Sequence, residues 1–163
     1  MAQEIVELVK SYETTFRCER DPSRESFAIR GIPMVPFIGV AGTPGGGKTY
    51  FAENVRKILE ERHGINAIVV PMDGYHYYRK QLDKFDDPVE AHARRGAAFT
   101  FDADRFVADV EEANRSHTFK FPSFDHAKKD PEEEMIEFDK KKHDAVIIEG
   151  LYVLLDYKPW NVL

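Results

Sequence analysis

The chain has 163 residues, of which 42% are hydrophobic and 32% are charged, and its net charge is −6. This composition is typical of one globular domain, and the negative charge argues against a broad nucleic-acid-binding surface. A single cysteine, Cys18, excludes an intramolecular disulfide and a Cys-X-X-Cys metal site. No apolar run approaches the roughly 20 residues that cross a bilayer, and the acidic start is unlike a targeting peptide. We therefore expect a cytoplasmic protein that binds neither nucleic acid nor membrane.

The first apolar residues recur at helical spacing, which predicts an amphipathic N-terminal helix. They are Ile5, Leu8, Val9, Tyr12 and Phe16. The charged stretch 17–30 then predicts a connector. We expect residues 1–30 to form this helix and connector, and residues 31–163 to form the main domain.

Residues 42–49 read Gly-Thr-Pro-Gly-Gly-Gly-Lys-Thr, a complete match to the P-loop pattern G-x-x-x-x-G-K-[ST]. The apolar segment 34–41 predicts a buried strand before it, and 50–59 has helical spacing after it. In this context glycines let backbone N–H groups surround phosphates, and the helix N-terminus adds partial positive charge. The alternative is a glycine-rich strand-to-helix turn without a ligand.

We expect this loop to bind a nucleoside triphosphate, with Lys48 on the β- and γ-phosphates and the Thr49 hydroxyl on Mg²⁺. The expected ATP-binding residues are Gly42, Thr43, Pro44, Gly45, Gly46, Gly47, Lys48, Thr49 and Tyr50.

Further strands and helices follow in alternation. Gly64 is a helix stop, 66–71 predicts a second strand, and Asp102 is placed to cap a helix. The segment 119–124 is extended or loop-like, and 145–148 predicts a third buried strand. Alternating strands and helices predict an α/β fold with a parallel sheet covered on both faces.

Two carboxylates fall where these strands end. Ligands of open parallel sheets bind beyond the carboxyl ends of the strands. Asp73, which follows the second strand, could accept the proton of an attacking hydroxyl, although Asp-Gly is also a common turn dipeptide. Glu149, directly after the third strand, could hold Mg²⁺ directly or through water, or could be an ordinary strand-end or helix-capping acid. We interpret the charged runs 132–134 and 140–142 as solvent-facing and nonfunctional.

Five segments, in this order, resemble the phosphoribulokinase/uridine kinase/pantothenate kinase group of P-loop kinases, especially uridine kinase-like proteins of fungi and bacteria. They are GVAGTPGGGKT (39–49), VPMDGYHYYRKQLD (70–83), DPVEAHARRGAAFTFDADRF (87–106), FPSFDHAKKDP (121–131) and VIIEGLYVLLD (146–156). The P-loop alone specifies only the superfamily, whereas the segments around DGYH, RRGAAFTFD and IIEGLYVLL are specific to this group.

The resemblance implies a three-layer P-loop NTPase fold and a set of site residues. It implies Asp73 as the catalytic base beside Lys48, and Glu149 with Thr49 as the metal shell. The implied acceptor-binding residues are Tyr75, His76, Asp102, Phe124, Asp125 and His126. Arg95 could clamp a phosphate or end a solvated helix. The histidines could equally be surface residues, and the tyrosine could simply pack.

The resulting expectation is an ATP- and Mg²⁺-dependent kinase. It would transfer the γ-phosphoryl group to a hydroxyl of a nucleoside, a sugar-like or a pantothenate-like metabolite. The alternatives are an NTPase whose acceptor is water, and a nucleotide-binding domain without turnover.

The family pattern continues beyond the strand ending at Glu149, with another strand, an arginine-rich lid helix and a closing strand. This chain ends at Leu163. We therefore expect only part of the sheet, an apolar edge at strand 35–41, and little turnover without the lid arginines. With that edge exposed, we expect the chain to be unstable, to self-associate, or to need the missing C-terminal region.

Overall fold

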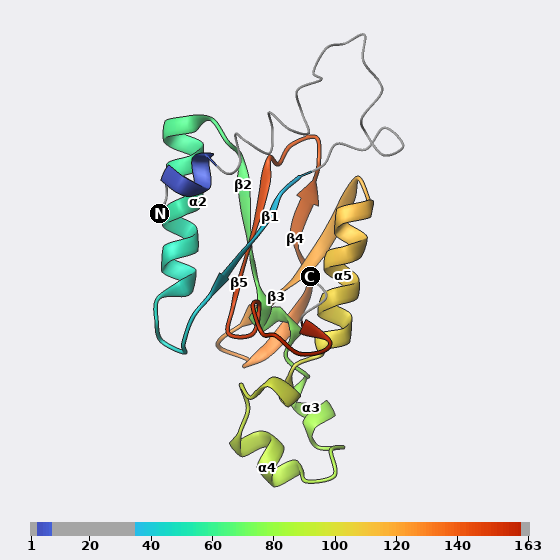
Figure 1. The fold of residues 1–163 in the computed structure, drawn as a ribbon. Helices are drawn as coiled ribbons and strands as arrows, with labels where there is room; N and C mark the ends of the chain where they lie inside the picture. Colours follow the sequence, from blue (N-terminus) through green and yellow to red (C-terminus); the bar gives the residue numbers. More distant parts are fainter. Residues whose placement is uncertain (1–2, 8–34, 161–163) are drawn as a thin grey trace.

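The computed structural model describes residues 3–7 and 35–160 (Figure 1). Residues 3–7 are helical, and Val6 packs against α2. The rest of the predicted N-terminal helix and the connector lie outside the described residues. The main elements are β1 (Phe37–Ala41), α2 (Lys48–His63), β2 (Ala67–Pro71), α3 (Arg79–Leu82), α4 (Pro88–Ala93), α5 (Ala103–Arg115), β3 (Thr118–Asp125), β4 (Asp130–Asp139) and β5 (Ala145–Gly150).

The central sheet has three parallel strands in the order β1-β5-β2. Glu149 on β5 lies opposite Val40 on β1 and Pro71 on β2, so the three strands end at one edge. Within the described ranges β1 pairs with β5 alone and is an edge strand. The register therefore brings the P-loop, the turn after β2 and the end of β5 together.

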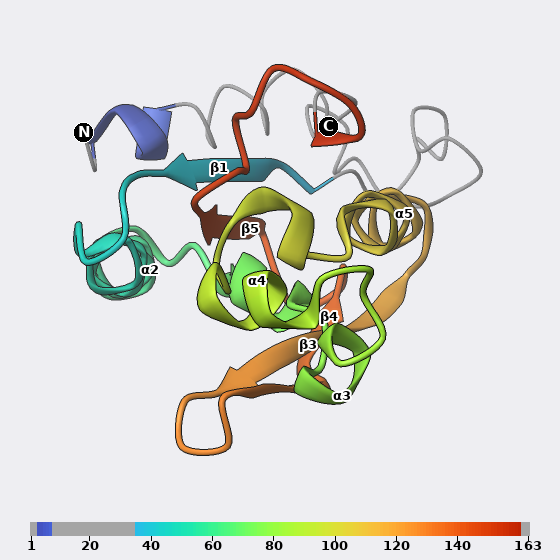
Figure 2. The ribbon, with the colours of Figure 1, turned by 90° about the horizontal axis from the view of Figure 1, so that it is seen from below.

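Helices cover both faces of this sheet, as predicted. Because successive strand residues point to opposite faces, β5 serves two cores. Ala145 and Ile147 pack with α2, whereas Val146 and Ile148 pack with α5 and the β3–β4 hairpin. Figure 2 shows α2 and α5 on opposite sides of the strands. The fold is thus a three-layer α/β arrangement.

Both helix-end predictions are confirmed. Gly64 ends α2 in the left-handed region at φ 63°, and its N–H donates to Glu60 O. Asp102 caps α5 by accepting a hydrogen bond from the backbone N–H of Arg105.

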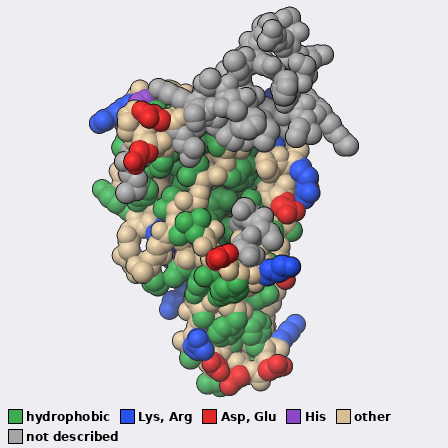
Figure 3. All heavy atoms as spheres, viewed as in Figure 1, with side chains coloured by type: hydrophobic (Ala, Val, Ile, Leu, Met, Phe, Trp, Pro, Cys, Tyr) green, Lys and Arg blue, Asp and Glu red, His purple; other side chains and the backbone are tan. Residues whose placement is uncertain are grey.

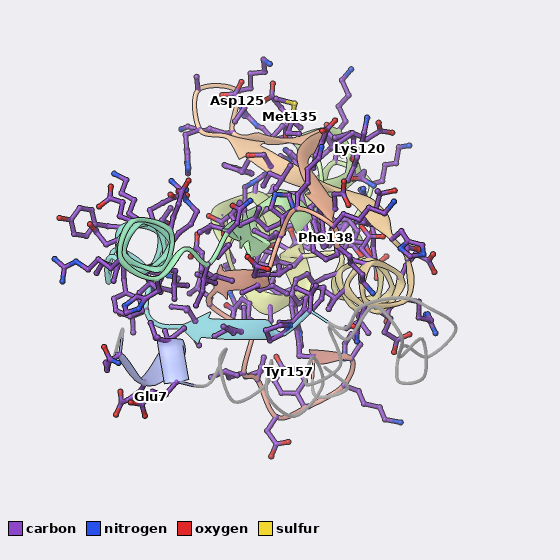
Figure 4. The ribbon with its side chains drawn as sticks, turned by 90° about the horizontal axis from the view of Figure 1, so that it is seen from above. Glu7, Lys120, Asp125, Met135, Phe138 and Tyr157 are labelled. Carbon is purple, nitrogen blue, oxygen red and sulfur yellow. The ribbon has the colours of Figure 1, made fainter. Side chains whose placement is uncertain are left out.

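The segment 119–124, expected to be extended or loop-like, is extended: it forms β3, which pairs with β4 in an antiparallel hairpin. Its register shifts between Phe121 and Ser123, at Pro122, which lacks the N–H that a regular ladder needs. In Figure 4, Phe138 points from the hairpin toward the centre of the molecule, while Met135 and Lys120 lie on its outer side. The hairpin therefore adds a buried face to the α5 side of the sheet.

The prediction that both charged runs face solvent is wrong for Lys140. Its side chain is 2% exposed, and Nζ donates to Asn114 O near the end of α5. A long lysine stem can be buried when its ammonium reaches the free carbonyls of a helix C-terminus. Glu133 is also engaged within the fold, through Arg105 and Tyr78.

An arm of residues 78–99 carries α3 and α4 and projects from the sheet (Figure 1). Its two stems are joined by hydrogen bonds from Tyr77 N to Thr100 O, at 3.0 Å, and from Asp102 N to Tyr75 O, at 2.8 Å. On the face drawn in Figure 3, acidic and basic side chains are interspersed on this arm. None of the helices in the described ranges has the length and apolar character needed to cross a membrane.

Candidate functional site

The P-loop forms a glycine-rich turn that leads directly into α2. Gly45 and Gly47 have φ angles of 69° and 77°, a region that favours glycine. The helix begins at Lys48 after Gly47, without a side-chain cap and without an acidic residue in its first turn. Its first N–H groups therefore have no side-chain acceptor from the cap, which fits a bound phosphate.

The side chains of Lys48 and Thr49 have different hydrogen-bond partners. Lys48 Nζ folds back to donate to Thr43 O, at 3.0 Å. Thr49 Oγ1 donates to Glu149 Oε1, at 2.8 Å, and so links α2 to the end of β5. Tyr50 is 78% exposed beside them. The lysine is thus held over the loop by a single contact that a phosphate could replace.

Glu149 is a buried acid, with 5% of its surface exposed. Its pKa is raised above the ordinary value for glutamate, mainly because of burial and with a contribution from the charge of Asp73. The hydrogen bond from Thr49 opposes this rise. Lys48 and His126 lower the pKa of Glu149 through their positive charges. Glu149 lies between the end of β1, which leads into the P-loop, and the end of β2, which leads into the Asp73 turn.

A magnesium ion fits this chemistry. The described residues hold no cluster of three or more His, Cys, Asp or Glu side chains suited to a metal. Mg²⁺ in phosphate sites usually takes one or two protein oxygens, with phosphates and water completing its shell. The Thr49 hydroxyl and the Glu149 carboxylate supply such oxygens, and a cation would compensate the buried negative charge.

Asp73 lies in a short turn, Met72–Tyr75, that follows β2. Its backbone carbonyl accepts from His76 N, at 3.2 Å, and from His76 Nδ1, at 2.9 Å. Its carboxylate is partly buried and makes no hydrogen bond to another described residue. A carboxylate without such a partner at the sheet edge can accept a proton from a bound hydroxyl.

Gly74 brings this turn against the hairpin. A Cβ atom on Gly74 would lie 2.6 Å from Pro122 O, so only glycine allows the approach. The position of Asp73 therefore depends on β3 as well as on β2.

Three of the expected acceptor residues come together. The His76 ring lies 3.9 Å from the Phe101 ring and 5.1 Å from the Phe124 ring, centre to centre. Phe124 in turn contacts His126, at 5.2 Å. Burial lowers the pKa of His76, which favours its neutral form. This aromatic group borders Asp73.

Other expected acceptor residues are already engaged elsewhere. Tyr75 fits the alternative of a packing residue, because its ring is 1% exposed and packs edge-on against Phe106. The Asp102 carboxylate caps α5. Asp125 accepts from the N–H groups of Ala127 and Lys128 and shapes the hairpin turn.

Arg95 is neither a solvated helix end nor an open clamp. Its Nη2 donates to Asp130 Oδ1, at 3.2 Å, and its side chain is 17% exposed. Within the described part of the chain, Nη1 is buried without a hydrogen-bond partner.

Sequence reasoning missed the ion-pair network between α5 and β4. Arg105 pairs with Glu133, and Glu133 also accepts from the Tyr78 hydroxyl. The partners are 28 and 55 residues apart, so no local spacing could reveal them.

The sequence pattern of the Phosphoribulokinase / Uridine kinase family matches residues 37–162. The chain belongs to this family. It is 42% identical over 127 residues to "Putative uridine kinase C227.14" of Schizosaccharomyces pombe, covering 76% of this chain and 54% of that protein. It is 32% identical over 175 residues to "ATP-dependent kinase YFH7" of Lachancea thermotolerans, covering 88% of this chain and 49% of that protein. The chain thus spans about half the length of the curated relatives it matches.

Solved structures agree on the fold. A "putative fructose transport system kinase" from Silicibacter sp. TM1040 superposes with a TM-score of 0.70 at 26% identity, over 93% of this chain and 67% of that one. D-glycerate 3-kinase from Cryptococcus neoformans superposes with a TM-score of 0.60 at 19% identity, over 92% of this chain and 52% of that one. The latter likeness concerns the fold alone.

Proposed function

We propose that this chain carries the nucleotide site and the base of an ATP- and Mg²⁺-dependent kinase. It would transfer the γ-phosphoryl group to a hydroxyl of a small metabolite. The observation that carries the proposal is the convergence of Thr49, Asp73 and Glu149 at one edge of the sheet. Membership of a kinase family supports the same reaction.

Each residue has a distinct part in this proposal. The P-loop N–H groups and Lys48 bind the phosphates, and Lys48 leaves Thr43 O to do so. Thr49 and Glu149 would hold Mg²⁺, which when bound offsets the negative charge of the phosphates. Asp73 orients the acceptor hydroxyl and takes its proton.

In the proposed phosphoryl transfer, every bond formed is matched by a bond broken, and the proton that is released has an acceptor. The acceptor oxygen forms a bond to the γ-phosphorus as the bond from that phosphorus to the bridging oxygen of ADP breaks. The hydroxyl proton passes to the Asp73 carboxylate. His76, Phe124 and His126 form the side of the site on which we place the acceptor.

The acceptor class remains the one expected from the sequence: a nucleoside, a sugar-like or a pantothenate-like metabolite. The acceptor class is supported by two relatives whose printed names mention hydroxyl-bearing molecules, a putative uridine kinase and a putative fructose transport system kinase.

An acceptor screen scored by ADP release tests the proposal. The screen uses a protein extended beyond Leu163, because we expect little turnover without the lid arginines. In the presence of ATP and Mg²⁺, we expect one class of hydroxyl-bearing metabolite to accelerate ADP release by this protein. ADP release that no acceptor accelerates would favour the NTPase alternative. Tight ATP binding without ADP release would favour a nucleotide-binding domain without turnover.

A further inference from the structure

Glu133 on β4 joins the arm to α5 through one carboxylate. Its Oε1 accepts from Tyr78 Oη, at 2.7 Å, and from Arg105 Nη1, at 2.9 Å. Its Oε2 accepts from Arg105 Nη2, at 2.5 Å. The two parallel hydrogen bonds between Arg105 and Glu133 fix the orientation of both of these side chains, which a single hydrogen bond would not do.

The same network reaches the residues next to Asp73. The Arg105 guanidinium lies 5.7 Å from the centre of the Tyr75 ring, and its Nε lies 3.6 Å from Asp109. Hydrogen bonds from Arg105 lower the pKa of Glu133, which keeps the carboxylate ionised. The Arg105–Glu133 pair therefore contacts both tyrosines: Arg105 lies over the Tyr75 ring, and Glu133 accepts a hydrogen bond from Tyr78.

A second carboxylate of β4 holds the two stems of the arm. Asp130 Oδ1 accepts from the backbone N–H of Arg79, at 2.9 Å, and from Arg95 Nη2, at 3.2 Å. Arg79 begins α3, and Arg95 lies where the arm returns to the sheet. One oxygen thus ties both stems to the start of β4.

The hairpin consequently contacts the segment after β2 at three successive points. Gly74 lies against Pro122, Tyr78 donates to Glu133, and Arg79 donates to Asp130. Asp73 directly precedes the first of these points. By contrast, its own carboxylate has no hydrogen-bond partner among the described residues that would fix it.

We propose that Asp130 and Glu133 are positioning residues, which set the place of the Asp73 carboxylate relative to the P-loop. The inference rests on the proposed function of Asp73 as the base. A displacement of about 1 Å at a reacting group can reduce turnover about 100-fold, so such support matters for a kinase.

The contribution of the Arg105–Glu133 pair to global stability is small. The Arg105 and Glu133 side chains are 38% and 44% exposed, and exposed pairs stabilise proteins little. Loss of the Glu133 carboxylate should therefore loosen the segment 73–79 without unfolding the molecule. A purely structural role predicts the opposite, a general loss of stability. Loss of the Asp130 carboxylate should lower stability more, because its partner Arg95 is only 17% exposed.

Hydrogen exchange and kinetics of the full chain test the proposal together. The variants are Glu133→Gln, Asp130→Asn and the milder Tyr78→Phe, which removes one hydroxyl only. Glu134→Gln is the matched control, since Glu134 is the next residue on β4 and pairs with Lys120 on the outer side. We expect amide exchange in 73–79 to rise about 10-fold in the two carboxylate variants, to rise less in Tyr78→Phe, and to stay unchanged in the control.

The kinetic arm uses ATP, Mg²⁺ and the best acceptor from the screen. We expect turnover to fall about 10- to 100-fold in Glu133→Gln and Asp130→Asn, with an unchanged KM for ATP. Wild-type exchange at 73–79 in both carboxylate variants would overturn the proposal, as would a uniform rise across the molecule in Glu133→Gln. If the wild-type protein extended beyond Leu163 shows no acceptor-dependent ADP release, the proposed function fails, and the exchange comparison alone decides the positioning role.

Discussion

Thr49 Oγ1 donates a hydrogen bond to Glu149 Oε1 across 2.8 Å, which joins the first turn of α2 to the end of β5. The two residues are 100 positions apart in the chain. Their contact places a hydroxyl and a buried carboxylate beside the P-loop, where both oxygens could bind a metal ion together with the phosphates of ATP.

Glu149→Gln should weaken the Mg²⁺-dependent part of ATP binding. Glutamine keeps the size and can still accept from Thr49, but it lacks the charge that a divalent cation needs. The ratio of ATP affinity with Mg²⁺ to ATP affinity without it should be at least about 10-fold smaller in the variant than in the wild type. When EDTA removes the Mg²⁺, the two proteins should bind ATP about equally well. Calorimetry with and without Mg²⁺ measures this difference. An equal Mg²⁺ effect in both proteins would remove Glu149 from the metal site.

Lys48→Ala should weaken ATP binding without disturbing the fold. Lys48 Nζ makes an exposed contact to Thr43 O, so its loss leaves no buried group unpaired. A charged hydrogen bond to phosphate contributes roughly 1.5–3 kcal/mol, or on the order of 10- to 150-fold in affinity. Titration with a fluorescent ATP analogue, together with circular dichroism, checks both parts. Wild-type affinity in the folded variant would contradict the P-loop assignment.

Gly74→Ala should displace the Asp73 turn. The added Cβ would lie 2.6 Å from Pro122 O and 2.9 Å from Pro122 C, and backbone cannot yield as a side-chain end can. Overpacking of this kind costs about 1–3 kcal/mol of unfolding free energy. Urea unfolding measures that loss, and ATP titration should show affinity near that of the wild type. A variant as stable as the wild type would show that β3 does not constrain the turn.

The stability of the chain should fall as the pH drops through the range in which histidine titrates. Burial lowers the pKa of His143 below 6.5, and its Nδ1 accepts a hydrogen bond from Asp139 N, at 3.0 Å. The unfolded chain therefore takes up this proton more readily than the folded chain below about pH 6.5. The contribution of His143 is present above that pH and is lost as the pH falls toward the folded-state pKa.

Urea unfolding at pH 7 and pH 5.5 measures this dependence. His143→Asn keeps an acceptor for Asp139 N but cannot titrate, so its stability should fall less over the same interval. An equally steep loss in both proteins would assign the effect to other groups.

The strand ends could be predicted from the sequence because the signals are local. The P-loop pattern, the apolar run before Glu149 and the cap at Asp102 each occupy a few consecutive residues. The hairpin could not be predicted in the same way. Its pairing joins Thr118 to Asp139, and Pro122 interrupts the alternation that normally indicates a strand.

The remaining site residues depend on contacts between distant segments. Tyr75 is polar at one end, but its ring fills the core beside Phe106. Glu133 sits in an acidic run typical of solvent, yet it pairs with Arg105 of α5. Composition and spacing describe such residues only by type, whereas their roles follow from tertiary packing.

Self-association through β1 stays a prediction. Among the described residues β1 has one strand partner, β5, and an unpaired edge can recruit another chain. Sedimentation across a range of protein concentrations measures it directly. A monomer at all concentrations would contradict the prediction.

The most direct test of the central proposal compares Asp73→Asn with the wild type in acceptor-dependent ADP release, with both proteins extended beyond Leu163 to include the lid. Asparagine keeps the shape of the side chain but cannot take up the hydroxyl proton. We predict turnover about 10²- to 10⁴-fold lower, with ATP affinity little changed. Wild-type turnover in the variant, with the same acceptor, would contradict the assignment of Asp73 as the base.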